Sequence, residues 1–178
     1  MTINTHPRDV FKFCPRCGCK GFETSDQGHS FHCEGCHFVY FINNSAAVAC
    51  LIFDLEGKLL LTRRALEPAK GMLDLPGGFV NPMERVEDTI VREIREELGV
   101  RVTKSKFMVS FPNEYIYSGF SVFTVDLAFI CSVNNLSTIV PDDDVADFEF
   151  IFPEEISKEH LCSLSMYNII SYYINNYR

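Results

Sequence analysis

The chain has 178 residues, of which 47% are hydrophobic and 22% are charged, with 16 phenylalanines and no tryptophan. This composition suits one ordinary domain with a small extra module, and it excludes long disorder, collagen-like repeats and low-complexity sequence. No apolar run approaches the roughly 20 residues needed to span a membrane. The first residues show no basic stretch followed by an apolar segment, so we expect no membrane association and a cytoplasmic location.

The net charge is −8, which argues against broad binding of nucleic acid through a basic surface. The charge is uneven, because residues 1–44 carry four basic and four acidic side chains and the remainder carries the whole excess. A small anionic ligand stays compatible with this balance, since divalent cations can turn a cluster of carboxylates into an anion site.

Four of the eight cysteines form two CxxC pairs, Cys14 with Cys17 and Cys33 with Cys36, separated by fifteen residues. In a reducing compartment these are expected to be metal ligands rather than disulfides. The spacing is typical of a tetrahedral zinc site made by two rubredoxin-like knuckles, and four unligated thiols are the alternative. Four thiolates would leave no open position on the ion, so we expect a structural zinc that supplies folding free energy to a small module.

The remainder of the chain predicts several strands with few helices between them, so we place a zinc ribbon over 1–44 and a second domain over 45–178. The expected elements are strands over 46–53 and 58–64 joined as a hairpin, a loop over 65–76, a helix over 84–98 that stops at Gly99, strands over 100–111, 121–133 and 148–152, and a helix over 161–173. This order favours an α+β fold in which helices flank a mixed sheet.

The predicted helix over 84–98 carries three glutamates on the margin of its apolar stripe. With about 100° per residue, Glu93, Glu96 and Glu97 share an arc that borders the buried face, while Arg92 falls on the solvent side. Like charges at this spacing repel and partial burial raises the cost, so a hard cation such as Mg²⁺ or Mn²⁺ would stabilise them. The helix alone is equally compatible with an acidic face that binds no metal.

Gly78, Glu84 and the run REIREELGV over 92–100 together resemble the Nudix box at all nine of its specified positions. The resemblance extends over about residues 46–160 and implies an α/β/α sandwich with a mixed sheet, here preceded by a zinc ribbon. It also implies a hydrolase that cleaves the diphosphate of a nucleoside diphosphate linked to another moiety.

The resemblance also implies roles for individual residues. Glu93 and Glu97 would bind Mg²⁺ or Mn²⁺, Glu96 would bind it directly or through water, and Gly77 would offer a backbone carbonyl. Metal ions at this position would neutralise charge on phosphorus and lower the pKa of an attacking water. The residues expected to support the cluster are Gly78, Glu84 and Arg92.

The general base is expected to be a carboxylate in a loop after the box. Asp144, the last of three consecutive aspartates over 142–144, fits best by its distance from the following strand, although the family more often has glutamate there. An acidic turn without catalytic function is the alternative. Two further departures, Met83 in place of glycine and the absence of tryptophan over 71–74, affect no ligand position but can change loop geometry.

The substrate is less constrained than the reaction. A ribbon followed by a Nudix box resembles NADH pyrophosphatases, but the chain lacks their SQPWPFP-type segment and has FPNEYIYSGF over 111–120 instead. Similar PNxYxYxG segments occur in ADP-ribose pyrophosphatases, so we favour ADP-ribose or a similar nucleotide sugar, with NADH or NAD as the alternative. Tyr115 and Tyr117 could stack on a base or sugar, although aromatic residues of a strand are often core.

Arg63 and Arg64 could pair with phosphate, but alternation along a strand should turn one of them away, and both could face solvent. A second class of function is a non-catalytic Nudix ligand sensor whose ribbon docks to another molecule. The intact glutamates favour catalysis over the sensor. The expected partner is a small nucleotide substrate, and the sequence is compatible with a homodimer.

Overall fold

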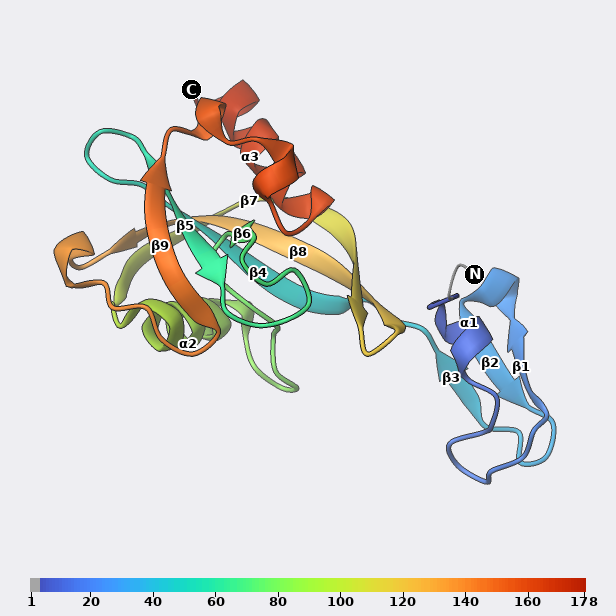
Figure 1. The fold of residues 1–178 in the computed structure, drawn as a ribbon. Coiled ribbons are helices and arrows are strands. Elements are labelled where there is room, and N and C mark those ends of the chain that lie inside the picture. Colours follow the sequence, from blue (N-terminus) through green and yellow to red (C-terminus); the bar gives the residue numbers. More distant parts are fainter. Residues whose placement is uncertain (1–3) are drawn as a thin grey trace. The chain divides into compact units, whose positions relative to one another are not determined.

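The computed structural model describes residues 4–178, apart from the side chain of Asp26 (Figure 1). The chain divides into two compact units. The first comprises the described part of Met1–Asn44 together with Glu114–Phe123, and the second comprises Ser45–Asn113 and Thr124–Arg178. The segment Glu114–Phe123, which the sequence prediction places in the second domain, is therefore grouped with the N-terminal residues.

The first unit is built around a three-stranded antiparallel sheet in the order β1-β2-β3. Its elements are α1 (Pro7–Val10), β1 (Phe22–Ser25), a 3₁₀ turn over Asp26–Gly28, β2 (Ser30–Cys33) and β3 (Val39–Phe41). Two stacked rings, Phe22 and Phe31 with centroids 4.7 Å apart, and two cysteines, Cys14 and Cys33, form its small core. So little apolar burial suits a module that depends on a metal for its stability.

The second unit contains two three-stranded sheets, ordered β4-β8-β7 and β6-β5-β9. Its strands are β4 (Ser45–Ile52), β5 (Leu59–Arg64), β6 (Leu73–Asp74), β7 (Val102–Tyr117), β8 (Phe120–Val133) and β9 (Val145–Ile151), and its helices are α2 (Val86–Leu98) and α3 (Leu164–Tyr177). A 3₁₀ turn over Leu136–Thr138 precedes β9, and two more over Pro153–Glu155 and Lys158–His160 lie between β9 and α3. Strand β4 is parallel to β8, whereas β5 is antiparallel to both β6 and β9. The combination of parallel and antiparallel strand pairs with flanking helices confirms the predicted fold class.

The two helices cover different apolar clusters. Ile90 and Ile94 of α2 pack with alternate residues of β4, including Cys50. Ile169 of α3 belongs to a second cluster that contains Leu61 of β5. Figure 1 shows α2 and α3 on either side of the strands, as a sandwich requires. None of the helices within residues 4–178 is long and apolar enough to cross a membrane.

The predicted hairpin between the first two strands is paired only next to its turn. A single antiparallel bridge joins Phe53 to Leu59, after which β4 and β5 enter different sheets. Both strands are apolar on successive residues because each is covered on both faces, and a strand of this kind pairs inside a sheet rather than as an exposed hairpin.

Several element boundaries differ from the prediction, and three of these differences have a visible cause. Helix α2 begins at Val86 because the backbone of Arg85 is still extended, and Glu84, which precedes it, accepts a hydrogen bond from the Asn81 N–H at 3.0 Å. Helix α3 begins at Leu164, where the Ser163 hydroxyl accepts from the Met166 N–H. Strand β7 continues to Tyr117, beyond the predicted end at residue 111, because it pairs with β8 through to a tight turn.

Candidate functional site

The glutamates of α2 lie where the helical pattern places them, on the margin of the buried stripe. Glu93 is 9% exposed and Glu97 is 4% exposed. Glu96 is only half-buried. Two carboxylates are thus held out of water on one helix, at positions one turn apart.

The loop that contains Gly77 and Gly78 runs beside β4 and brings its backbone against these carboxylates. The Val48 N–H donates to the Gly78 carbonyl at 2.9 Å, which fixes the loop on the strand. Extended backbone alternates the direction of its polar groups, so the Gly77 N–H points away from β4 and donates to Glu97 Oε2 at 3.0 Å. We expect the Gly77 carbonyl to face the same edge.

Both glycines are required by close approach. A Cβ on Gly77 would lie 2.1 Å from the Val48 carbonyl oxygen, and the φ of +144° also disfavours a side chain there. A Cβ on Gly78 would lie 2.6 Å from Glu93 Oε1. Gly78 is therefore the residue that leaves room for the carboxylate of Glu93.

Arg92 turns back from its predicted solvent position and binds three carboxylates. Its Nε and Nη2 donate to the two oxygens of Glu84 at 2.8 and 2.9 Å. Its Nη1 donates to Glu93 Oε1 at 2.6 Å and to Glu96 Oε2 at 3.1 Å. The Arg92 side chain is only 22% exposed, because it is long enough for its charged end to reach the cluster. It lowers the pKa of Glu84 to about 2, together with the Asn81 N–H.

The pKa values of Glu93 and Glu97 shift in the opposite direction. Burial raises the pKa of Glu97 well above its usual range, and the charges of Asp144, Glu93 and Asp74 add to the effect against the opposing Gly77 N–H. Burial also raises the pKa of Glu93, although Arg92 opposes it. One guanidinium therefore does not compensate the buried carboxylates, and a divalent cation with oxygen ligands would.

The structure places Asp144 beside this cluster. Its charge raises the pKa of both Glu93 and Glu97, and its side chain is half-buried, whereas Asp142 and Asp143 are exposed. The loop is fixed by hydrogen bonds from the Asp142 N–H to the Glu97 carbonyl at 3.0 Å and from the Ala65 N–H to the Asp144 carbonyl at 2.7 Å. Among the three consecutive aspartates, Asp144 is therefore the one whose charge acts on the two buried glutamates.

Asp74 is a carboxylate of this region that the sequence analysis missed. It is the last residue of β6, its carboxylate pairs with Arg64 at 3.0 Å, and its charge helps to raise the pKa of Glu97. Burial raises the pKa of Asp74, with Arg64 and the Leu75 N–H opposing. The sequence offered no signal for it, because β6 has only two residues inside a segment that contains proline and glycine.

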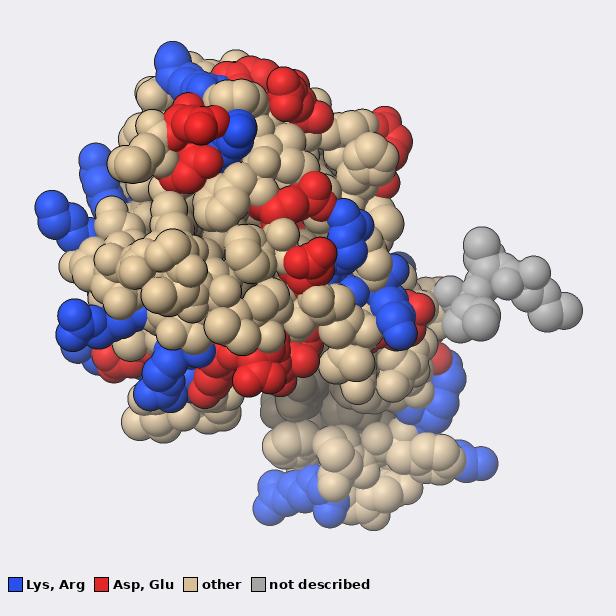
Figure 2. Space-filling view, turned by 60° about the vertical axis from the view of Figure 1, so that its left-hand side comes forward, with Lys and Arg blue, Asp and Glu red and all other residues tan. Residues whose placement is uncertain are grey.

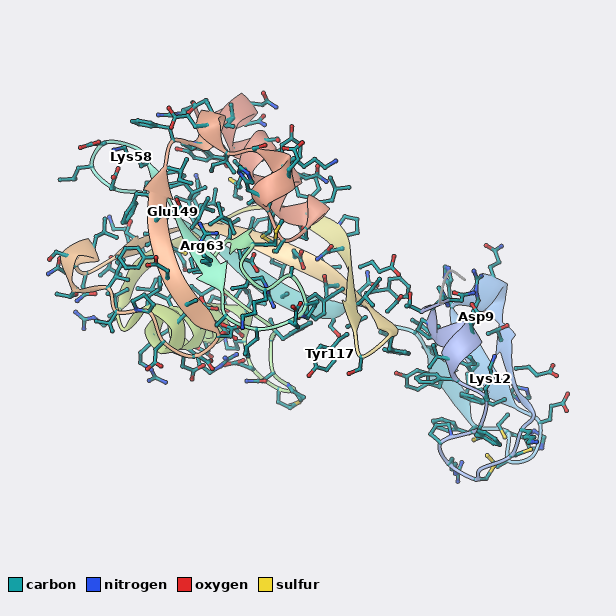
Figure 3. The ribbon with its side chains drawn as sticks, in the orientation of Figure 1. Asp9, Lys12, Lys58, Arg63, Tyr117 and Glu149 are labelled. Carbon is teal, nitrogen blue, oxygen red and sulfur yellow. The ribbon has the colours of Figure 1, made fainter. Side chains whose placement is uncertain are left out.

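Arg63 and Arg64 both contact the loop that follows β5. Arg64 Nε donates to the Pro68 carbonyl at 3.0 Å, and its side chain is 16% exposed, so the alternative that both arginines face solvent is wrong for Arg64. Arg63 donates to the Gly71 carbonyl and pairs with Glu149 of β9, as Figure 3 shows. Its side chain is 43% exposed, which makes it the more available of the two for a phosphate.

The aromatic segment over 111–120 is divided between the units. Tyr115 and Tyr117 lie near the end of β7 in the first unit, with their rings stacked at 6.4 Å and Tyr117 58% exposed. Phe120, which begins β8, stacks on Phe11 at 5.2 Å. The structure therefore groups the two tyrosines with the N-terminal module, whereas the carboxylates belong to the second unit.

The four paired cysteines converge in the first unit. The Sγ atoms of Cys14, Cys17, Cys33 and Cys36 all lie within 4.8 Å of one another. Four thiolates in a closed cluster match a structural zinc site in number and chemistry. Cys19 lies outside this cluster, where its Sγ accepts from the Gly21 N–H at 3.3 Å.

The surface charge agrees with the net balance of the sequence. The face in Figure 2 carries acidic and basic side chains in separate small groups, and no continuous basic surface is visible on it.

Comparison with known protein families identifies the family of this chain. The family model described as "NUDIX domain" matches residues 43–171, which is more than half of the chain. The chain belongs to the Nudix family. A Nudix hydrolase structure from Nitrosomonas europaea superposes with a TM-score of 0.67 at 22% identity, covering 94% of this chain and 92% of that one. The Nudix domain of Shewanella oneidensis NrtR, solved in complex with ADP ribose, gives a TM-score of 0.62 at 18% identity and covers 78% of this chain and 91% of that one.

Curated Nudix relatives match over shorter stretches. An NAD-capped RNA hydrolase NudC of Chromobacterium violaceum is 34% identical over 99 residues, which cover 56% of this chain and 36% of the relative. An ADP-ribose pyrophosphatase of Methanocaldococcus jannaschii is 49% identical over 49 residues, which cover 28% of this chain and 29% of the relative. The match thus spans about a third of each relative's length.

Proposed function

We propose that this Nudix protein hydrolyses the diphosphate of ADP-ribose or a similar nucleotide sugar, with Mg²⁺ or Mn²⁺ as cofactor. The observation that carries the proposal is the pair of buried carboxylates, Glu93 and Glu97, beside the glycine loop. Such a pair is costly without a cation and suits hard divalent ions. A sensor without catalysis has no need of this arrangement.

The residues would share the chemistry as follows. Glu93, Glu97 and the Gly77 carbonyl would bind the metal, with Glu96 as a further direct or water-mediated ligand. When bound, the metal neutralises negative charge on the diphosphate and acidifies a water. Arg92 holds Glu84, Glu93 and Glu96 in place through its hydrogen bonds.

Asp144 is the proposed general base. A water oxygen forms a bond to one phosphorus while the bridging P–O bond breaks, and the proton of the water passes to the Asp144 carboxylate. With ADP-ribose the products are AMP and ribose 5-phosphate. The half-buried position of Asp144 beside Glu93 and Glu97 supports this role. A zinc ion held by the four paired cysteines would be structural.

NADH or NAD is the second candidate substrate, because relatives that match this chain include NAD-capped RNA hydrolases. A hydrolysis panel with Mg²⁺ and Mn²⁺ distinguishes the two: ADP-ribose, NADH, NAD, nucleoside diphosphate sugars, dinucleoside polyphosphates and nucleoside triphosphates. We expect ADP-ribose or a nucleotide sugar to give the highest kcat/KM. NADH as the best substrate would replace the first proposal by the second, and inactivity on every compound would contradict both.

A further inference from the structure

The carboxylate of Asp74 binds to three segments of the second unit. Its Oδ1 accepts a hydrogen bond from the Leu75 N–H at 2.9 Å, and its Oδ2 accepts one from Arg64 Nη1 of β5 at 3.0 Å. The thiol of Cys162, which lies in the segment before α3, donates a further hydrogen bond to it. The Asp74 side chain is 17% exposed. A carboxylate that accepts from several donors, one of them charged, is satisfied inside the protein and keeps those donors in place.

Asp74 lies on the face of its sheet that also carries α2. Its register partner on β5 is Thr62, and directly opposite residues of two paired strands share a face. Leu60 lies two residues before Thr62 on the same face of β5, and it packs in the apolar cluster that contains Ile94 of α2. The charge of Asp74 helps to raise the pKa of Glu97, as expected for two carboxylates on one side of the sheet.

The glycine loop begins directly after Asp74. The Cys50 N–H of β4 donates to the Pro76 carbonyl at 2.8 Å, and the Gly77 N–H donates to Glu97 Oε2 at 3.0 Å. Gly77 has no side chain to anchor it, and glycine has a wide choice of backbone conformations. The direction of its N–H and carbonyl therefore depends on how the chain is held on either side. Strand β4 holds the loop at Pro76, and the carboxylate of Asp74 holds the residues before it.

Arg64 connects Asp74 to the rest of the site. Its Nε donates to the Pro68 carbonyl at 3.0 Å while its Nη1 donates to Asp74, so one guanidinium joins the loop after β5 to the start of the glycine loop. The next residue, Ala65, donates its N–H to the Asp144 carbonyl at 2.7 Å. The end of β5 thus contacts both loops that flank the buried glutamates.

We propose that Asp74 is a positioning residue that fixes the backbone of Gly77 beside Glu97 and thereby presents the Gly77 carbonyl to the catalytic metal. It acts through the Leu75 N–H and Arg64 rather than as a ligand, because a carboxylate paired with a guanidinium faces a positive charge that repels a cation. The effect on metal binding rests on the proposed function, which places the metal at Glu97 and Gly77. The effect on the backbone does not depend on that function.

The test is hydrogen exchange of backbone amides, measured by NMR in the zinc-loaded protein without Mg²⁺ or Mn²⁺. In Asp74→Asn we expect the Gly77 amide to exchange about ten- to hundredfold faster than in wild type, because a charge-assisted hydrogen bond is lost and the loop opens locally. Amides of the central strand β8 report global unfolding and should keep their rates. The matched control is Glu149→Gln, which removes the carboxylate paired with Arg63 (Figure 3). Glu149 lies opposite Leu61, on the other face of β5, so Gly77 should keep its wild-type rate.

Each outcome supports or overturns the role of Asp74. Wild-type exchange at Gly77 in folded Asp74→Asn, or exchange that is accelerated equally in β8, would overturn it. If Asp74→Asn does not fold, Arg64→Lys decides in the same way, because lysine keeps the charge but cannot bind Asp74 and the Pro68 carbonyl together.

Titration with Mn²⁺ separates this inference from the proposed function. If wild type does not bind Mn²⁺, the metal site of the proposed function fails, while the exchange rates still decide whether Asp74 fixes Gly77. If wild type binds Mn²⁺, an affinity about tenfold lower in Asp74→Asn but unchanged in Glu149→Gln supports the positioning role. Equal affinity in wild type and Asp74→Asn would overturn it.

Discussion

Substitution of Gly78 by alanine tests whether the loop positions Glu93 for metal binding. The added Cβ would lie 2.6 Å from Oε1, 2.7 Å from Cδ and 2.9 Å from Oε2 of Glu93. Ordinary contact begins at 3.4 Å, so the carboxylate has to retreat by about 0.8 Å. Gly78 does not have a positive φ of the kind that disfavours side chains, so alanine strains the carboxylate rather than the backbone.

The expected result is a folded protein with a weakened metal site. We expect the affinity for Mn²⁺ to fall about ten- to hundredfold, as for other displaced metal ligands and their supports, and the free energy of unfolding to fall by about 1–3 kcal/mol. Calorimetric titration with Mn²⁺ and urea unfolding measure the two effects. Gly21→Ala is the control, because its Cβ would meet the nearest atom at an ordinary 3.4 Å. Wild-type Mn²⁺ affinity in a folded Gly78→Ala protein would refute the positioning of Glu93.

Three further predictions concern pH, zinc and catalysis. The pKa of Glu84 is lowered to about 2, so its pairing with Arg92 stabilises the fold fully at pH values above 4.5, the pKa in the unfolded chain. The difference in unfolding free energy between wild type and Glu84→Gln should therefore shrink as pH falls from about 4.5 towards about 2. A difference in urea unfolding that stays constant over this range would contradict the pairing. Elemental analysis should find about one zinc per chain. The Cys33→Ser variant should lose this zinc and its first unit should unfold, whereas Cys19→Ser should keep the zinc. A folded wild-type protein without zinc would rule out the four-cysteine site. Glu97→Gln should lower turnover at least about a hundredfold. Because burial and nearby charges raise the pKa of Glu97, the same variant should be more stable than wild type near neutral pH in the absence of metal. Lower stability of the variant in urea would show that burial of this charge is not costly.

The sequence was most informative where a contact is local. The helical period of α2 correctly predicted that Glu93 and Glu97 border the buried stripe, because one rigid element fixes both positions. The CxxC spacing likewise identified the four cysteines that converge, since each pair lies within one turn of chain.

Contacts that depend on long side chains or on pairing between distant strands were less predictable. A helical wheel gives the direction of the Cα–Cβ bond, so it could not show that Arg92 reaches back to Glu84. Asp74 comes near Glu97 only through the pairing of β6 with β5. The grouping of Phe120 with Phe11 likewise depends on chain segments far apart in sequence. Each of these contacts is decided by tertiary structure rather than by local pattern.

The most direct test of the proposed function is the initial rate of AMP release from ADP-ribose in Mg²⁺, measured for the wild-type protein and for Glu97→Gln at matched folded concentration. Metal-dependent release of AMP by the wild-type protein, stopped by chelation and at least about a hundredfold slower in Glu97→Gln, is the predicted result. No release by zinc-loaded, folded wild type, or an equal rate in the variant, would contradict a diphosphatase site built on the buried glutamates of α2.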